Sequence, residues 1–287
     1  MSDPACDSVP IVWINLDRAD RRRRRMLHAL AAGGWTHQRI AAIDARESGI
    51  RLRAKPDWSR RGTTFPGVRR FAEASPFRRT SRAELACLAS WQRALARAAD
   101  SMARLDARMV LLVEDDCGAT LACPRAWPVS LDEIASAAGD AWTVVQLAPI
   151  NPRVRRELFD RWRRDDGPVV SKRLVRSHGN GAVLLHRRAL DHLRPHLPTA
   201  PDRPPGPLRH PWAVRPVADK WLYAMLPAET VFVAGVPFFT QDAADSDLHP
   251  DHLDRFHRGS RDVVETIWGE AGWRELAAAL AAWDAIE

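Results

Sequence analysis

Three consecutive acids end an apolar run in the segment MVLLVEDD, residues 109–116. The run is typical of a buried strand, which Glu114, Asp115 and Asp116 would close. Side chains alternate between the faces of a strand, so Glu114 and Asp116 are expected on one face and Asp115 on the other. Two carboxylates on one face beside a low-dielectric core repel each other unless a cation joins them. The triplet by itself is more typical of a solvated strand end or a helix N-cap, and a divalent-cation site is the alternative.

Length and composition limit the class of protein. The chain has 287 residues, of which 46% are apolar, enough for one large core or two modest ones. No run of about 18 uncharged apolar residues occurs, so we expect no membrane span. The first ten residues, MSDPACDSVP, lack the basic and apolar regions of a secretory signal. Four cysteines without CxxC or zinc-finger spacing then favour a cytoplasmic protein with reduced thiols.

The charge of the chain indicates an anionic partner. The formal net charge is +7 and the pI is near 10.0, and the positive charge comes almost entirely from arginine. A basic protein is attracted to phosphate groups on nucleotides, nucleic acid or lipid surfaces. Peripheral association with the inner face of an anionic membrane is one expectation that follows.

The order of apolar runs and amphipathic segments predicts an α/β fold with a mainly parallel central sheet. Ser81 and Glu84 have the spacing of a capping box at the start of a helix. Strands are expected at residues 10–17, 39–44, 109–113, 142–149, 182–185 and 230–239. Helices are expected at residues 19–35, 81–102, 130–139, 186–197, 217–227 and 262–286. Loops are expected at residues 45–80, 198–216 and 241–259.

Seven segments occur along the chain in the order of a known family's motifs. They are IVWINLDRADRRRRRM, RIAAIDAR, AELACLASWQRAL, VLLVEDD, HGNGAVLLHRRALDHL, PVADKWL and PFFTQDAADSDL, and they cover roughly residues 10–250. Together they resemble glycosyltransferase family 25, the lipopolysaccharide-type glycosyltransferases related to the procollagen galactosyltransferases. The chain departs from the family where Ser-His becomes Ser90-Trp91, where Gly-Thr-x-Gly-Tyr becomes GNGAV, and where Ala218 is inserted into the Pro-Val-Asp segment. The acid triplet is intact.

The resemblance implies a GT-A-like, Rossmann-related fold in a single domain over residues 1–287. Residues 10–150 would form the nucleotide-sugar-binding half, residues 151–260 the acceptor-side half and residues 261–287 a C-terminal helix. The implied activity is metal-dependent transfer of galactose or glucose from a UDP-sugar to a hydroxyl of a glycan, lipid-linked saccharide or protein, as in lipopolysaccharide biosynthesis. The implied cofactor is Mn²⁺, or Mg²⁺.

The resemblance also indicates which residues form the site. For the metal they are Glu114, Asp116, Asp247 and His249. For the UDP-sugar they are Asn15, Leu16, Asp17, Arg18, Arg22, Asp44, Glu114, Asp115, Asn180 and Gln241. Some of these have simpler interpretations: Asp44 could hold a turn, the glycines beside Asn180 could form a plain turn, and most of the run Arg21–Arg25 could be a solvated helix face.

Transfer to a hydroxyl needs a group that takes up its proton. Asp219 is the first candidate for this base because it matches the family's Pro-Val-Asp segment, and Glu84 and Asp242 are its rivals. Asp219 could instead be a helix N-cap, and Glu84 could simply close the capping box.

Two alternatives use the positive charge differently. One is a basic protein that binds nucleic acid or an anionic surface on a degenerate glycosyltransferase scaffold, and the other is a glycosyltransferase with a nucleic-acid acceptor. The intact acid triplet and the late segment QDAADSDLH favour the saccharide-directed enzyme, because a protein that only binds would not need them.

Overall fold

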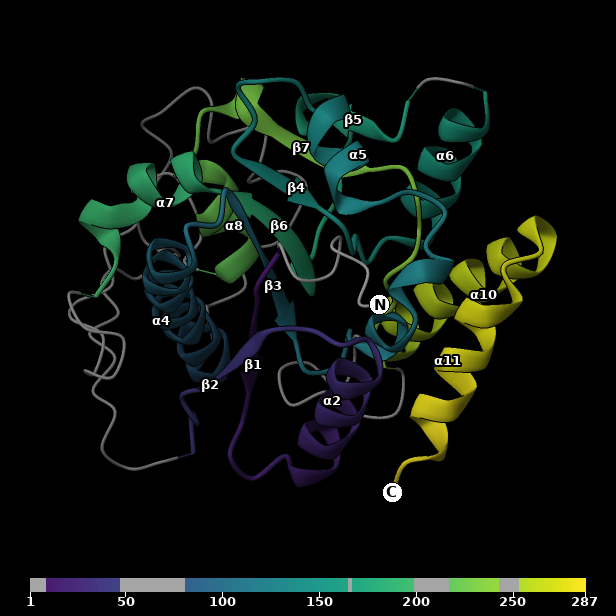
Figure 1. Cartoon of the computed structure of the whole chain (residues 1–287), viewed down its shortest axis with the longest axis horizontal. Coiled ribbons are helices and arrows are strands. Elements are labelled where there is room, and N and C mark those ends of the chain that lie inside the picture. The colour runs from purple at the N-terminus through teal and green to yellow at the C-terminus, as the bar shows by residue number, and fades with distance from the viewer. Residues whose placement is uncertain (1–8, 47–80, 165–166, 199–216, 243–252) are drawn as a thin grey trace.

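A seven-stranded sheet forms the centre of the computed structural model, which describes residues 9–46, 81–164, 167–198, 217–242 and 253–287 (Figure 1). The strands lie in the order β2-β1-β3-β6-β4-β7-β5. Their bounds are β1 Ile11–Asn15, β2 His37–Ala41, β3 Met109–Glu114, β4 Val144–Gln146, β5 Val169–Ser171, β6 Ala182–His186 and β7 Val231–Ala234.

Strand directions make the sheet mixed. Strand β1 pairs in parallel with β2 and β3, and β4 pairs in parallel with β7. Strand β6 lies antiparallel between β3 and β4, and β5 is antiparallel to β7. The α/β class is therefore confirmed and most strands share one direction. The pattern did not reveal that β6 reverses, because both faces of a central strand are apolar whatever its direction.

Helices lie on both faces of the sheet. The α-helices are α2 Asp20–Ala32, α4 Arg82–Leu105, α5 Leu131–Ala137, α6 Pro152–Arg163, α7 Arg187–Leu193, α8 Ala218–Ala224, α10 Gly259–Ala271 and α11 Arg274–Ala285. Short 3₁₀ segments are η1 Ala119–Ala122, η2 Pro124–Ala126, η3 Lys172–Leu174, η4 Arg194–His196 and η5 Ala228–Thr230, and η6 Leu253–Arg258 is π-helical.

Successive side chains of the central strands point to opposite faces of the sheet and pack into two separate cores. Leu111 of β3 packs in one core with α2, α5, α10 and α11, whereas Leu112 packs in the other with α4, α7 and α8. Figure 1 shows α4, α7 and α8 gathered on one side of the sheet and α10 and α11 on the other. Residues 109–113 are all buried, as their unbroken apolar run predicts for a strand covered on both faces.

Local signals placed most elements, with three differences. The tail expected to be one helix is two, because Gly272 (φ 74°) ends α10 in the left-handed conformation. Residues 253–258 are helical where the composition indicated a polar loop. Neither α6 nor β5 was expected, although α6 has a proline in its first turn and buries Leu158 and Phe159. Most of the loops expected at 45–80 and 198–216 lies outside the described residues.

Within the part of the chain that the structure describes, no helix combines the length and apolar character that a membrane span requires. Cys87, Cys117 and Cys123 are free thiols, and Cys6 lies outside the described residues.

Candidate functional site

A pocket of about 570 Å³ opens where β1 and β3 end and where the chain enters β6. Its volume is in the range of about 300–1,000 Å³ found for small-molecule sites. The carboxyl ends of parallel strands are also where ligands bind in open α/β sheets. The pocket gathers most of the residues expected from the sequence, which are Asn15, Leu16, Arg18, Arg22, Asp44, Glu84, Glu114, Asp115, Asp116, Asn180, Asp219 and Gln241.

The acid triplet divides between two tasks. Strand β3 ends at Glu114, so strand alternation does not place Asp115 and Asp116, which lie in the following turn. The Asp115 carboxylate is buried, accepts a 2.6 Å hydrogen bond from Asn15 Nδ2 and lies 3.5 Å from Arg22 Nε. Glu114 Oε1 instead accepts a 2.7 Å bond from the indole N–H of Trp91. Asp115 therefore ties the turn after β3 to the end of β1 and to α2, and all three acids line the pocket.

The Glu114 carboxyl lies in surroundings that disfavour its charge. Burial is the largest cause that raises its pKa, the charge of Asp116 adds to it, and together they bring the pKa to about 8 although the Trp91 hydrogen bond lowers it. Asp115 raises it less than Asp116 does. Asp116 is thus the acid that most strongly opposes ionisation of Glu114, and a cation near both would relieve that repulsion.

The described residues suit a cation whose coordinating atoms come partly from the protein and partly from a bound ligand. Among them, no group of three His, Cys, Asp or Glu side chains could hold a metal ion. The expected ligands Asp247 and His249 lie outside the described residues. Glu114 and Asp116 offer two carboxylates, which matches Mg²⁺-type sites completed by phosphate oxygens and water but not a site closed by protein alone.

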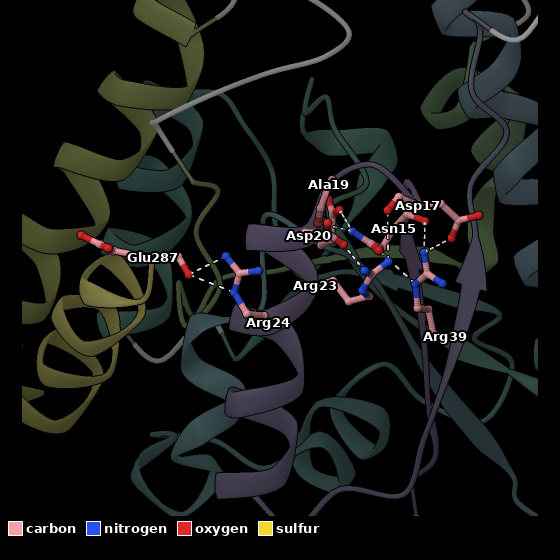
Figure 2. A network of polar contacts seen from close by, with 9 residues as sticks. Asn15, Asp17, Ala19, Asp20, Arg23, Arg24, Arg39 and Glu287 are labelled. Carbon is pink, nitrogen blue, oxygen red and sulfur yellow. Dashed lines mark hydrogen bonds and ion pairs between the residues drawn. The ribbon is translucent and has the colours of Figure 1, made fainter.

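Asn15 lines the pocket, but protein groups engage its side chain. It is 1% exposed, and its Oδ1 accepts a 2.9 Å bond from Arg39 Nε while its Nδ2 donates to Asp115. Arg39 also pairs with Asp17, whose side chain is 73% exposed and does not line the pocket (Figure 2). Asp17 therefore lies outside the pocket wall and its contact with a UDP-sugar stays a prediction, whereas the Asn15 side chain is engaged by protein groups. The sequence analysis did not predict the contribution of Arg39, because its contacts with Asn15 and Asp17 join residues that are far apart along the chain.

Asp44 holds a turn, as one of the two interpretations predicted. Its Oδ1 accepts a 2.9 Å bond from the backbone N–H of Arg46, and its Oδ2 lies 2.6 Å from Arg18 Nε. Partial burial raises the pKa of Asp44, but the Arg46 N–H and the Arg18 guanidinium lower it by more. Asp44 and Arg18 both line the pocket, so this ion pair forms part of its wall.

Asp242 is buried in an ion pair outside the pocket. Its Oδ2 lies 2.6 Å from Arg25 Nη1, and the two side chains are 3% and 2% exposed. Arg25 also donates to the backbone oxygens of Asp284 and Ile286, so it joins α2 to the end of α11. Its neighbour Arg24 donates to Glu287 O in the same way (Figure 2). One expectation is corrected, because Arg25 is not on a solvated face. Asp242 is paired with Arg25 and does not line the pocket, which makes it a weaker candidate for the base than Asp219 or Glu84.

The buried Arg25–Asp242 pair should be important for stability. Removing one partner leaves an uncompensated buried charge, so Arg25→Met should lower the free energy of unfolding by roughly 3–5 kcal/mol. The exposed ion pair between Arg23 and Asp20 provides the matched control, and Arg23→Met should change stability by less than about 1 kcal/mol. Urea unfolding of both variants measures the difference, and equal losses would contradict a special role for Arg25.

Helix α4 lines the pocket with one face. Ser81 and Glu84 form the predicted capping box, in which Glu84 Oε2 accepts a 2.7 Å bond from the Ser81 N–H. Glu84, Cys87 and Trp91 follow one another at the three- and four-residue spacing of a helix face, and all three line the pocket. Trp91 is 1% exposed and packs in the core, and it also fixes Glu114. Its helical spacing from Glu84 could have indicated this.

The segment before β6 brings Asn180 and Asp219 together with Gln241 at the pocket. Asp219 is the second residue of α8, not its N-cap, which is Val217. Asp219 Oδ2 accepts a 3.3 Å bond from the Gly179 N–H. The glycines serve close packing against protein atoms: Gly179 has φ 88°, and a Cβ on Gly181 would lie 3.0 Å from Gln241 Nε2.

Comparison with known proteins yields no matching family model and no matching curated protein.

Proposed function

We propose that this chain is a metal-dependent glycosyltransferase that transfers a hexose, galactose or glucose, from a UDP-sugar to a hydroxyl of a saccharide, lipid-linked or protein acceptor. The observation that carries the proposal is the meeting of opposite charges in one pocket. Glu114 and Asp116 line it from the end of β3 and the turn that follows, and Arg18 and Arg22 line it from the loop after β1 and from α2. Carboxylates suit a hard cation and guanidinium groups suit phosphate oxygens, so the pocket is complementary to a cation–diphosphate pair.

The residues of the chain would divide the reaction between them. Glu114 and Asp116 would hold Mn²⁺ or Mg²⁺, which when bound neutralises negative charge on the departing diphosphate. Trp91 keeps Glu114 in place through the indole hydrogen bond. Arg22, which contacts Asp115, would face the same phosphates and share their charge.

Asp219 is the preferred proton acceptor of the three proposed from the sequence. Its carboxylate lines the pocket and accepts backbone N–H groups of Gly179 and Lys220, which fix its direction. Glu84 also lines the pocket, but one of its oxygens closes the capping box of α4. With the hydroxyl and the sugar carbon held beside it, Asp219 would take the hydroxyl proton as the bond to the sugar forms.

Binding of UDP should depend on a divalent cation. At a UDP concentration about 100 times its dissociation constant, linkage stabilises the native state by about 2.7 kcal/mol. We expect the melting temperature to rise with UDP and Mn²⁺ together, to rise less with Mg²⁺, and to stay near that of the free protein with UDP in EDTA. Calorimetric titration under the same conditions gives the affinities.

The controls separate this proposal from the nucleic-acid alternative. AMP with Mn²⁺ tests base selectivity, and a single-stranded oligonucleotide tests charge-driven binding, which weakens steeply as salt increases. Equal UDP affinity in Mn²⁺ and EDTA would refute the metal role. Strong salt-sensitive oligonucleotide binding without any UDP binding would favour the basic binding protein.

A further inference from the structure

Side chains from several elements hold the backbone of the loop that precedes Asn180. Each of these bonds joins a backbone group of the loop to a side chain from another element. The bonds are Lys172 Nζ to Ser177 O (3.0 Å), His178 N to Asn151 Oδ1 (2.9 Å), Gln146 Nε2 to His178 O (2.9 Å) and to Gly179 O, Gly179 N to Asp219 Oδ2 (3.3 Å), and Tyr223 Oη to Gly179 O (3.2 Å). A loop tied at consecutive residues in this way has little freedom left when a ligand arrives.

Lys172 connects these bonds. Its Nζ donates to Gln146 Oε1 at 2.6 Å, to Ser177 O at 3.0 Å and to Ser177 Oγ at 2.7 Å, which uses all three hydrogens of an ammonium group. Gln146 Oε1 accepts from both Lys172 Nζ and Ser177 Oγ (2.6 Å each), and these two bonds point the amide so that its Nε2 faces the carbonyls of His178 and Gly179. Lys172 therefore fixes the loop directly and through Gln146.

Only three of the 43 lysine and arginine residues of the chain are lysines, namely Lys55, Lys172 and Lys220. A compact ammonium on a flexible stem can meet three acceptors arranged around a point, which a planar guanidinium cannot do. The Lys172 ammonium also lies 4.1 Å from the ring centre of Tyr223, a favourable cation–π distance. The contacts at this position therefore favour lysine over the arginine that supplies most positive charges of the chain.

The loop ends at a buried donor in the wall of the pocket. Asn180 is 7% exposed and lines the pocket, and among the described residues its Nδ2 has no hydrogen-bond partner. A buried amide donor without a partner is costly unless a ligand accepts from it. Gly179, at φ 88° and with Ile150 packed against it, sets the chain direction into Asn180.

We infer that Lys172 is a positioning residue that preorganises the 177–180 loop so that Asn180 Nδ2 donates to an acceptor oxygen of the bound sugar nucleotide. The class of ligand rests on the proposed function; the role of Lys172 in ordering the loop does not. Lys172 itself does not line the pocket and acts through the loop.

The protonation state of Lys172 makes the device sensitive to pH. Burial lowers its pKa to about 8, while the charge of Asp219 raises it. Among the described residues, the charged and titratable groups on Lys172's own segment and on the segments near it are Asp219, Lys220, Tyr223, His178, Glu229, Arg173 and Arg176. Above pH 8 the neutral amine has one donor fewer, so the loop should loosen. The free energy of unfolding should nevertheless increase between about pH 8 and 10.5. In that range the unfolded state binds more protons at this lysine than the folded state does, so raising the pH favours the folded state.

The test compares Lys172→Met and Lys172→Arg with Arg173→Met, which removes an exposed positive charge from the adjacent position. Hydrogen exchange of the His178 and Gly179 amides is measured without ligand. Tyr223 is the only tyrosine of the chain, so 3-fluorotyrosine labelling gives a single fluorine resonance next to Lys172. Calorimetry measures UDP-galactose and UDP-glucose affinity in Mn²⁺, and thermal unfolding verifies that each variant is folded.

We expect both Lys172 variants to exchange the two amides about tenfold faster and to bind the sugar nucleotide about tenfold more weakly, the loss expected for one or two hydrogen bonds. Arg173→Met should match the wild type. The wild-type fluorine resonance should titrate near pH 8, and that titration should be missing in Lys172→Met. Unchanged exchange in Lys172→Met would overturn the ordering role, and faster exchange with unchanged affinity would overturn the recognition role. A wild type that binds no sugar nucleotide would refute the proposed function and the ligand assignment, while the exchange data still decide the ordering role.

Discussion

Replacement of Asp219 by Asn should reduce glycosyl transfer by roughly a hundredfold or more while UDP and Mn²⁺ affinities stay near those of the wild type. Loss of a general base typically costs about 10²–10⁴-fold in rate. The Asn side chain keeps an oxygen that can still accept from the Gly179 N–H, so the loop before β6 should hold its shape. Single-turnover transfer and calorimetric UDP titration measure the two effects separately.

Asp132 offers a matched control for this variant. It is the second residue of α5, as Asp219 is of α8, so both carboxylates feel the same end of a helix dipole. Asp132 is exposed and lies outside the pocket, and Asp132→Asn should leave the rate unchanged. Near-wild-type turnover of Asp219→Asn would remove Asp219 from the mechanism and leave Glu84 as the candidate base. Weakened UDP binding would instead assign Asp219 to the donor site.

Replacement of Asp116 by Ala should remove the part of UDP binding that depends on Mn²⁺. Loss of an outer-shell partner of a metal ligand already lowers metal affinity about 10- to 100-fold, and loss of a ligand should exceed that. The fold should survive, because removing the Asp116 charge also removes one of the causes that raise the pKa of Glu114. UDP titrations in Mn²⁺ and in EDTA should then give the same affinity.

Asp115→Ala is the informative comparison because the neighbouring acid has a different task. Its carboxylate is bound by Asn15 and Arg22, so its loss should lower the melting temperature and leave buried donors without partners. Asp116→Ala should lower the melting temperature less. If the Asp116→Ala variant still binds UDP more tightly in Mn²⁺ than in EDTA, Asp116 is excluded as a metal ligand.

The sequence alone determined the features whose partners are close along the chain. Ser81 and Glu84 are three residues apart, and their capping box starts α4 as predicted. The apolar run 109–113 is long enough to require burial on both faces, and it became β3 in the middle of the sheet. The succession of strands and helices then determined the α/β class, because each amphipathic face must be covered by another layer.

The tertiary structure decided which of several similar side chains belongs to the site. Arg22 and Arg25 belong to one run of arginines, but only the fold sends Arg22 to Asp115 in the pocket and Arg25 to Asp242, which is 217 residues away. Asn15 and Asp115 meet across 100 residues, and Lys172 meets Gln146 across 26. No local pattern encodes such pairs, because the position of each polar side chain depends on how the sheet aligns distant segments and on which buried groups then need a partner.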